Sequence, residues 1–231
     1  MWANWQVVVT TEPGSVEHIP AEAASTYAKL AAACGAAYYQ QVADEVSTEL
    51  EPGGAVLDVG TGPGYLPVTL ADQVPEIRVY AFDFTRELLP YGHQEASRRG
   101  VADRVSFFAA DTYSIPAADR SYAGLVCTGV LHTLDEPAAA LAEFYRVLEP
   151  GGTAWVFDPT ILDVPDDPAE LDVDLTEPER EIFEAYGVRA EDEQRPLPVD
   201  RAEQLAADSP FAEFSIEVGD RNDVRLYLHR N

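Results

Sequence analysis

The chain has 231 residues, of which 46% are hydrophobic, so it can bury the core of one full domain and is not a disordered chain. Its 41 acidic and 15 basic residues leave a net charge of −26, which disfavours DNA, RNA and anionic lipids as partners because their phosphates would be repelled. The two cysteines lack the spacing of a disulfide framework or a metal site, and without a membrane-spanning stretch or a signal peptide at Met1–Trp5 we expect a cytoplasmic protein.

The N-terminal part of the chain is predicted to be mostly helical. Val7–Thr10 is a short β-prone piece, and from Ala21 to Leu50 the sequence is rich in alanine and other helix formers. We expect two helices there, broken near Gly35. Residues 1–50 would then form a helical cap, and residues 51–231 would form the main domain.

A strand, a glycine-rich loop and a helix follow in succession. Ala55–Val59 is apolar and rich in β-branched residues, which predicts a buried parallel strand. Gly60, Gly62 and Gly64 recur at every second position, and Tyr65–Ala71 has the apolar content of a short helix. Such a loop can turn sharply and offer backbone N–H groups to a ligand. A plain turn without a ligand is the less favoured alternative, because three glycines cost conformational entropy.

The second predicted strand ends in an acid. Ile77–Phe82 reads as a strand, and Asp83 follows it about twenty residues after the glycine loop. An acid at this place can accept hydrogen bonds from both hydroxyls of a ribose, although such acids also occur as helix N-caps. Phe84 could lie against an adenine face. Thr85–Arg99 is predicted to be a helix that Gly100 ends.

Three more strands are predicted before residue 160. They are Val105–Ala109, which leads into Asp111, then Gly124–Thr128, and Thr153–Asp158. A helix opened by Asp135 and running to Leu148 separates the last two. Strands that alternate with helices in this way indicate an open α/β sheet with mostly parallel strands.

The C-terminal part is predicted to hold helices and a hairpin. An acidic connector at Asp163–Asp174 precedes a helix from Thr176 to about Tyr186, capped by Thr176 with Glu179. A second helix runs to about Ala207, with Asp200 and Glu203 repeating the cap. Two alternating runs, at residues 214–218 and 224–229, make an antiparallel hairpin.

The glycine loop carries a specific resemblance. Its order, Asp58-x-Gly60-x-Gly62-x-Gly64, differs from the G-x-G-x-x-G of dinucleotide-binding proteins and resembles motif I of the class I S-adenosylmethionine-dependent methyltransferases. The resemblance implies a doubly wound, seven-stranded, mostly parallel Rossmann-like sheet with an antiparallel C-terminal hairpin. It also implies S-adenosylmethionine as the cofactor.

A second stretch is similar to the small-molecule branch of that family, which includes quinone-biosynthesis enzymes. It comprises Val130–His132 and Arg146–Gly152. The sequence departs from the pattern at Thr133, where many relatives have a second histidine, and at Ala123 and Glu149, which replace a usual aspartate and lysine. None of these changes removes a cofactor contact, but Thr133 leaves the acceptor side open.

The expected site lies at the carboxyl ends of the parallel strands. The resemblance and the strand ends together predict these cofactor-binding residues: Asp58, Gly60, Thr61, Gly62, Gly64, Asp83, Phe84, Asp111, Thr112 and Thr128. Three of these residues, Asp58, Asp83 and Asp111, are acids. They suit a cofactor that carries sulfonium and ammonium cations, and they would repel the pyrophosphate of a dinucleotide. No metal is predicted.

The candidate catalytic residues are His132 and Tyr27. A hydroxyl acceptor needs a base, and His132 follows the fourth strand closely enough to serve, although a packing or capping role is the plainer alternative. Tyr27 could face the acceptor or merely pack against the sheet edge, and Asp158 is a further candidate on the acceptor side.

The predicted function is methyl transfer from S-adenosylmethionine to a small-molecule acceptor by in-line displacement. The chain lacks the Asn-Pro-Pro-Tyr and Pro-Cys motifs of relatives that act on nucleobases. A nicotinamide oxidoreductase is disfavoured by the glycine spacing. A module that binds the cofactor or a protein partner without turnover stays open, as do the acceptor's identity and the oligomeric state.

The charge pattern suggests an environment. Lys29 is the only lysine, and an acidic, lysine-poor surface resembles that of proteins from halophiles that accumulate salt. High ionic strength would screen the self-repulsion of such a surface. We therefore hypothesise a halophilic origin.

Overall fold

The computed structural model describes residues 19–158, 173–183, 197–219 and 223–231. The predicted strand at Val7–Thr10, most of the connector at Asp163–Asp174 and the last residues of the helix predicted to reach Tyr186 lie outside these ranges.

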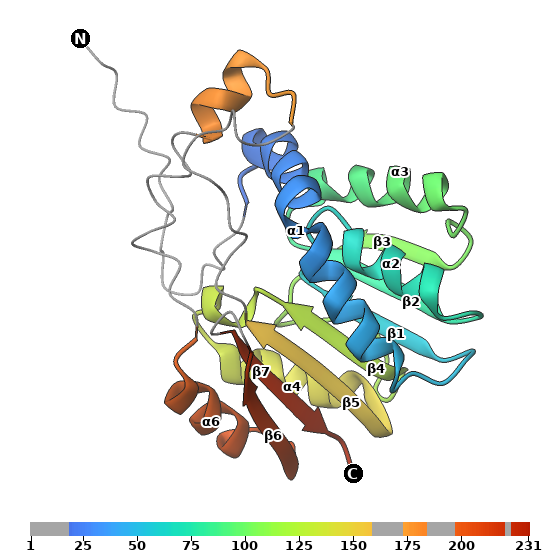
Figure 1. The fold of residues 1–231 in the computed structure, drawn as a ribbon. Coiled ribbons are helices and arrows are strands. Elements are labelled where there is room, and N and C mark those ends of the chain that lie inside the picture. The colour runs from blue at the N-terminus through green and yellow to red at the C-terminus, as the bar shows by residue number, and fades with distance from the viewer. Residues whose placement is uncertain (1–18, 159–172, 184–196, 220–222) are drawn as a thin grey trace.

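A seven-stranded sheet forms the centre of the molecule (Figure 1). Its strands are β1 (Ala55–Val59), β2 (Arg78–Asp83), β3 (Val105–Ala109), β4 (Tyr122–Thr128), β5 (Leu148–Asp158), β6 (Glu213–Val218) and β7 (Val224–His229). They lie in the order β3-β2-β1-β4-β5-β7-β6. The first five are parallel, and β7 runs antiparallel between β5 and β6. This confirms the predicted α/β fold with an antiparallel C-terminal hairpin.

Helices cover both faces of the sheet (Figure 1). They are α1 (Ala24–Ser47), α2 (Tyr65–Gln73), α3 (Leu89–Arg99), α4 (Pro137–Val147) and α6 (Val199–Asp208), with short 3-10 turns η1 (Ala21–Ala23), η2 (Arg86–Leu88) and η3 (Leu131–Thr133); residues 177–183 are also helical. Side chains from α1, α2 and α3 pack on one face and side chains from α4 and α6 on the other. Strand β1 contributes to the cores on both faces. Val56 lies in the core beneath α1, α2 and α3, and Leu57 lies in the core beneath α4 and α6.

The predicted break near Gly35 is wrong. Helix α1 runs without interruption through this glycine, which is buried. A glycine within a helix costs about 1 kcal/mol, which tertiary packing easily offsets. Here Tyr38, Val42 and Val46 of α1 are buried in the same core as the sheet.

Three local predictions about helix ends have different outcomes. Gly100 does end α3 in the left-handed conformation (φ 73°), as predicted. The predicted cap at Asp200 is wrong, because α6 begins after Pro198 and Asp200 lies in its first turn without a side-chain cap. At the helix of residues 177–183, Oε2 of Glu179 accepts the backbone N–H of Thr176 at 2.8 Å, so the expected pairing of these two residues is present.

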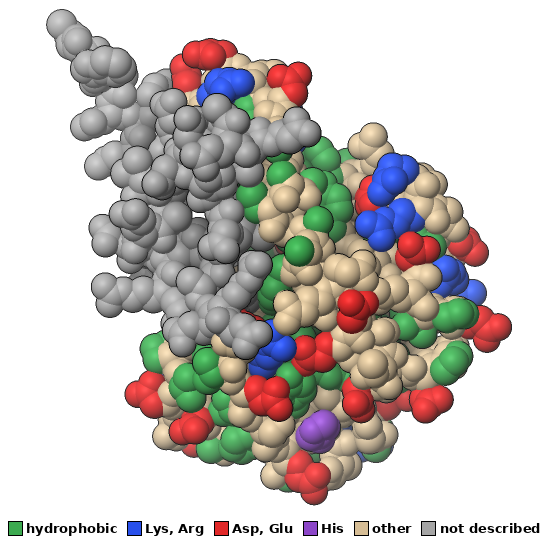
Figure 2. Space-filling model, in the orientation of Figure 1, with side chains coloured by type: hydrophobic (Ala, Val, Ile, Leu, Met, Phe, Trp, Pro, Cys, Tyr) green, Lys and Arg blue, Asp and Glu red, His purple; other side chains and the backbone are tan. Residues whose placement is uncertain are grey.

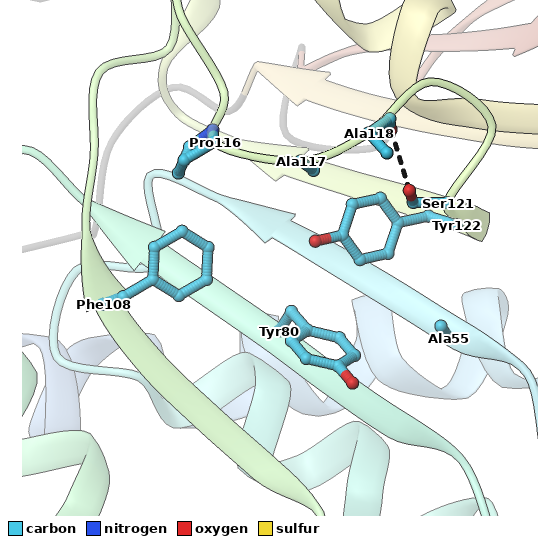
Figure 3. Close-up of a pocket in the computed structure, with 8 residues that line it drawn as sticks. All are labelled: Ala55, Tyr80, Phe108, Pro116, Ala117, Ala118, Ser121 and Tyr122. Atoms are coloured by element: carbon cyan, nitrogen blue, oxygen red, sulfur yellow. Dashed lines mark hydrogen bonds between the residues drawn. The ribbon is translucent and has the colours of Figure 1, made fainter.

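The connection from β3 to β4 contains no helix. A hollow of about 390 Å³ lies beside this connection. It is on the same face of the sheet as α4 and α6, in a part that these helices do not cover. The rings of Tyr80, Phe108 and Tyr122 border it, and the loop through Pro116 and Ala117 forms its other wall (Figure 3). Within the described residues, no helix is long and apolar enough to cross a membrane.

Candidate cofactor and acceptor site

The glycine loop between β1 and α2 is packed tightly on two sides. Gly60, Gly62 and Gly64 all have positive φ, at 68°, 54° and 77°. A β carbon at Gly60 would lie 2.2 Å from Cγ2 of Val130, and one at Gly64 would lie 2.8 Å from the Cα of Gly92. These two positions therefore require glycine for the packing of the fold as well as for the turn.

Gly62 differs from the other two loop glycines. Among the described residues, a β carbon there would meet only Cε1 of Tyr27, at an ordinary distance of 3.6 Å. The structure thus brings Tyr27 of α1 over the middle of the glycine loop, where the sequence analysis expected a residue of the acceptor side. Whether Tyr27 takes part in catalysis stays a prediction.

The carboxylate of Asp83 ties the glycine loop to the end of β2. Its Oδ2 accepts the backbone N–H of Gly62 at 2.8 Å, and its Oδ1 accepts the backbone N–H of Thr85 at 2.8 Å. The alternative role weighed for Asp83 was a helix N-cap, but the N-cap of η2 is Thr85, so the second bond is a local turn bond. A carboxylate oxygen can accept more than one hydrogen bond, so these bonds leave the ribose role intact as a prediction.

Asp58 is a buried carboxyl group directly before this loop. The residue is 1% exposed, and its Oδ2 has no hydrogen-bond partner in the described part of the chain. Burial raises the pKa of Asp58 to about 7, the Thr61 side chain opposes this rise, and the charge of Asp83 adds to it. A buried acceptor of this kind fits a ligand that brings a cation or N–H donors to the loop. The cationic groups of S-adenosylmethionine meet that requirement.

The remaining predicted residues follow the strand ends as expected. Phe84, just after β2, is 52% exposed and presents a ring to solvent. Asp111, just after β3, accepts the N–H of Tyr113 on Oδ1 at 2.9 Å, and Thr112 beside it is buried. Thr128 is the last residue of β4 and is half-buried. The fold therefore gathers the predicted residues at one edge of the sheet, while their roles remain predictions.

His132 and Asp158 form a contact that the sequence analysis missed. Nδ1 of His132, in η3, lies within hydrogen-bond distance of Oδ1 of Asp158, at the end of β5. Oδ2 of Asp158 accepts the N–H of Leu197 at 3.3 Å. Both residues lie at or just after a predicted strand end, which was a partial signal, but the sequence does not show that β4 and β5 are neighbours in the sheet.

The family comparison agrees with this site. Residues 56–152 match the family model of a methyltransferase domain. The ubiquinone/menaquinone biosynthesis C-methyltransferase of Desulfotalea psychrophila is 32% identical over 111 residues, which are 48% of this chain and 44% of the relative. The chain spans less than half the length of the curated relatives it matches, with 20% to 46% of each covered. Residues 56–152 are thus similar to a methyltransferase domain, and S-adenosylmethionine is the cofactor that this similarity implies.

Solved structures share the fold over most of the chain. A protein from Methanococcus maripaludis, described as a candidate S-adenosyl-L-methionine-dependent methyltransferase, superposes with a TM-score of 0.70 at 19% identity, covering 94% of this chain and 98% of its own. The [4+2]-cyclase SpnF superposes with a TM-score of 0.55 at 23% identity, covering 79% of this chain and 61% of its own. At these identities the likeness concerns the fold alone. Among the described residues, no three His, Cys, Asp or Glu side chains are placed to hold a metal ion.

Proposed function

We propose that this chain is an S-adenosylmethionine-dependent methyltransferase that acts on a small-molecule acceptor. The observation that carries the proposal is the buried carboxyl group of Asp58, whose Oδ2 lacks a described partner, beside a glycine loop with three positive φ angles. When bound, S-adenosylmethionine would supply an electrophilic methyl group with a good leaving group already attached. The protein then has mainly to align the acceptor with that methyl group.

Each predicted binding residue has a proposed task. The loop of Gly60, Thr61, Gly62 and Gly64, together with Asp58, would hold the methionine part. Asp83 would accept the ribose hydroxyls, and Phe84 and Asp111 would contact the adenine, with Thr112 beside them. Thr128 would hold the amino group through its backbone carbonyl. All of them follow the carboxyl ends of parallel strands, which is where open α/β sheets bind their ligands.

The acceptor is proposed to be a small molecule of the kind handled in quinone biosynthesis. The name of the Desulfotalea relative supports this, and so does the net charge of −26, which disfavours nucleic acid. The same charge, with Lys29 as the only lysine, supports a protein that works at high salt in a halophile.

Calorimetry in molar KCl tests the cofactor. S-adenosylmethionine, S-adenosylhomocysteine and NAD are titrated into the wild type and into Asp83→Ala and Asp58→Asn. We expect micromolar binding of the first two ligands to the wild type, none of NAD, and at least a tenfold weakening in both variants. Asp103→Ala removes an exposed acid outside the site and should bind as the wild type does.

A folded wild type that binds neither sulfur ligand would overturn the proposal. The alternative of a binding module without turnover would then remain, with a protein partner as its ligand in place of the cofactor. If binding occurs, methyl transfer from labelled S-adenosylmethionine to candidate acceptors separates an enzyme from a module that only holds the cofactor. The shared fold of a [4+2]-cyclase shows that the fold alone does not decide this point.

A further inference from the structure

The contact between His132 and Asp158 lies where β4 and β5 end side by side. One carboxylate oxygen of Asp158 lies within hydrogen-bond distance of Nδ1 of His132, and the other accepts the N–H of Leu197. The carboxylate is therefore held from two sides, and it fixes the orientation of the imidazole ring. With Nδ1 facing a carboxylate, the neutral ring carries its proton on Nδ1, and Nε2 becomes the basic nitrogen.

Exposure divides the roles of the two side chains. The side chain of Asp158 is 2% exposed, whereas that of His132 is 11% exposed. Burying a carboxylate is costly unless it is paired, and the pairing here spans two strand ends. The carboxylate of Asp158 is thus held on the buried side of the imidazole ring, and the ring itself lies nearer to the surface of the site. This arrangement favours a histidine that gains a proton during the reaction.

The histidine also lies close to the predicted cofactor loop. Val130 lies two residues before His132, and its Cγ2 is so close to Gly60 that a β carbon on this glycine would be only 2.2 Å away. The turn that carries His132 therefore packs directly against the glycine loop. A base at this place would be near the methyl group of a cofactor held by that loop.

Building on the methyl transfer proposed above, we propose that Asp158 is a positioning residue for His132 and that His132 accepts a proton from the methyl acceptor. The acceptor would then bear a hydroxyl or acidic C–H group, rather than a tertiary amine that reacts without losing a proton. In that step the acceptor O–H bond breaks and its proton moves to Nε2 of His132. An oxygen lone pair forms the bond to the methyl carbon, the electron pair of the broken carbon–sulfur bond stays on sulfur, and the imidazolium later releases its proton to water.

Nuclear magnetic resonance of ¹⁵N-histidine-labelled protein tests the positioning role without any acceptor. The chain has four histidines, so His132→Gln identifies the signal of interest, and His93→Gln, which removes an exposed ring on α3, is the matched control. In the neutral wild type we expect the His132 proton on Nδ1. In Asp158→Asn the pKa of His132 should fall by about one unit or more, because the carboxylate stabilises the imidazolium.

A neutral His132 with its proton on Nε2 would overturn the proposal, and so would a pKa unchanged in Asp158→Asn. The tautomer is measured on the wild type, so the test does not depend on how well the variant folds. These outcomes are separate from those of the calorimetry, since a protein that fails to bind S-adenosylmethionine can still show the predicted tautomer.

The acceptor class is tested with labelled S-adenosylmethionine and three probes. Catechol carries a neutral hydroxyl, 4-nitrocatechol carries one that is largely ionised at neutral pH, and N,N-dimethylbenzylamine is a tertiary amine. We expect methylation of the catechols and a loss in Asp158→Asn of at least about tenfold more for catechol than for 4-nitrocatechol. Equal losses for the two catechols would indicate a merely structural pair, and transfer to the amine alone would contradict the proposal.

Discussion

At the scale of single residues, Asp58 shows a carboxyl group that the fold holds at an energetic cost. Its pKa is raised from 3.8 to about 7, chiefly by burial, so the ionised form is disfavoured in the folded protein. For an acid with a raised folded pKa, stability falls as the pH rises from the unfolded value to the folded one. The cost is therefore absent below about pH 4 and complete above about pH 7.

Asp58→Asn should make the unliganded protein more stable at pH 8. The gain should grow between pH 4 and pH 7, stay constant above that window, and not exceed about 4 kcal/mol. Urea unfolding in 1 M KCl across this range measures it, with Asp103→Asn as a control for the loss of one exposed negative charge. A difference that does not vary with pH would show that Asp58 titrates normally. The same variant should bind S-adenosylmethionine weakly, so stability and function would change in opposite directions.

The sequence predicted where the candidate residues lie better than it predicted their bonds. The acids at the ends of β1, β2 and β3 could be found because strand ends and glycine spacing are local features. The bonds of Asp83 to the loop and of His132 to Asp158 join residues 21 and 26 positions apart. They depend on which strands are neighbours, and that order is set by tertiary packing.

At the scale of elements, a polar cluster joins α1 to β7 on the face of the sheet that α1 covers. Oε2 of Glu45 accepts from Nη1 of Arg225 at 2.9 Å, and Oε1 accepts from the hydroxyl of Tyr227 at 2.5 Å. Asp223 accepts from Nε of the same arginine at 2.7 Å. The cluster thus fastens an N-terminal helix to the C-terminal hairpin, although the two are 180 residues apart.

Glu45→Ala should lower the free energy of unfolding by roughly 2 kcal/mol, because a partly buried arginine loses one of its two carboxylate partners and the hydroxyl of Tyr227 loses its hydrogen bond at 2.5 Å. Tyr227→Phe, which leaves both ion pairs of Arg225 in place, should cost about 1 kcal/mol. Glu49→Ala is the matched control, since it removes an exposed acid near the end of the same helix. Urea unfolding measures these free energies. Equal free energies of unfolding for Glu45→Ala and Glu49→Ala would mean that the cluster adds no stability.

Helices were harder to predict than strands. The parallel strands follow from apolar runs between turn signals, and β1 and β3 begin and end where the sequence placed them. Gly35 and the predicted cap at Asp200 were misread because local propensity costs only about 1 kcal/mol and packing overrides it. No helix was predicted between β3 and β4 and the connection contains none, but the hollow beside Tyr80 has no signal in the sequence.

At the scale of the whole molecule, negative charge dominates the surface. Acidic side chains are spread over the described part of the face shown in Figure 2, whereas basic ones occupy a few spots. Several of the bases are used in ion pairs within the chain, including Arg98 with Glu95, Arg146 with Glu143 and Lys29 with Glu179. Because the chain has 41 acids and only 15 bases, most acids have no base of their own to pair with.

That excess predicts a strong dependence of stability on salt. The screening length falls from about 10 Å at 0.1 M to about 3 Å at 1 M, so repulsion between surface acids should largely vanish in molar KCl. We expect the melting temperature to rise by roughly 5 to 10 °C between 0.1 and 2 M KCl, which for a chain of this size corresponds to a few kcal/mol.

Neutralising four exposed acids (Glu22→Gln, Asp103→Asn, Glu149→Gln and Glu203→Gln) should raise the melting temperature at low salt and reduce the slope with salt. A flat response of the wild type would count against adaptation to high salt. A rise that is equally steep in the neutralised variant would mean that KCl acts through general exclusion from the protein surface, since screening can only relieve charges that are present.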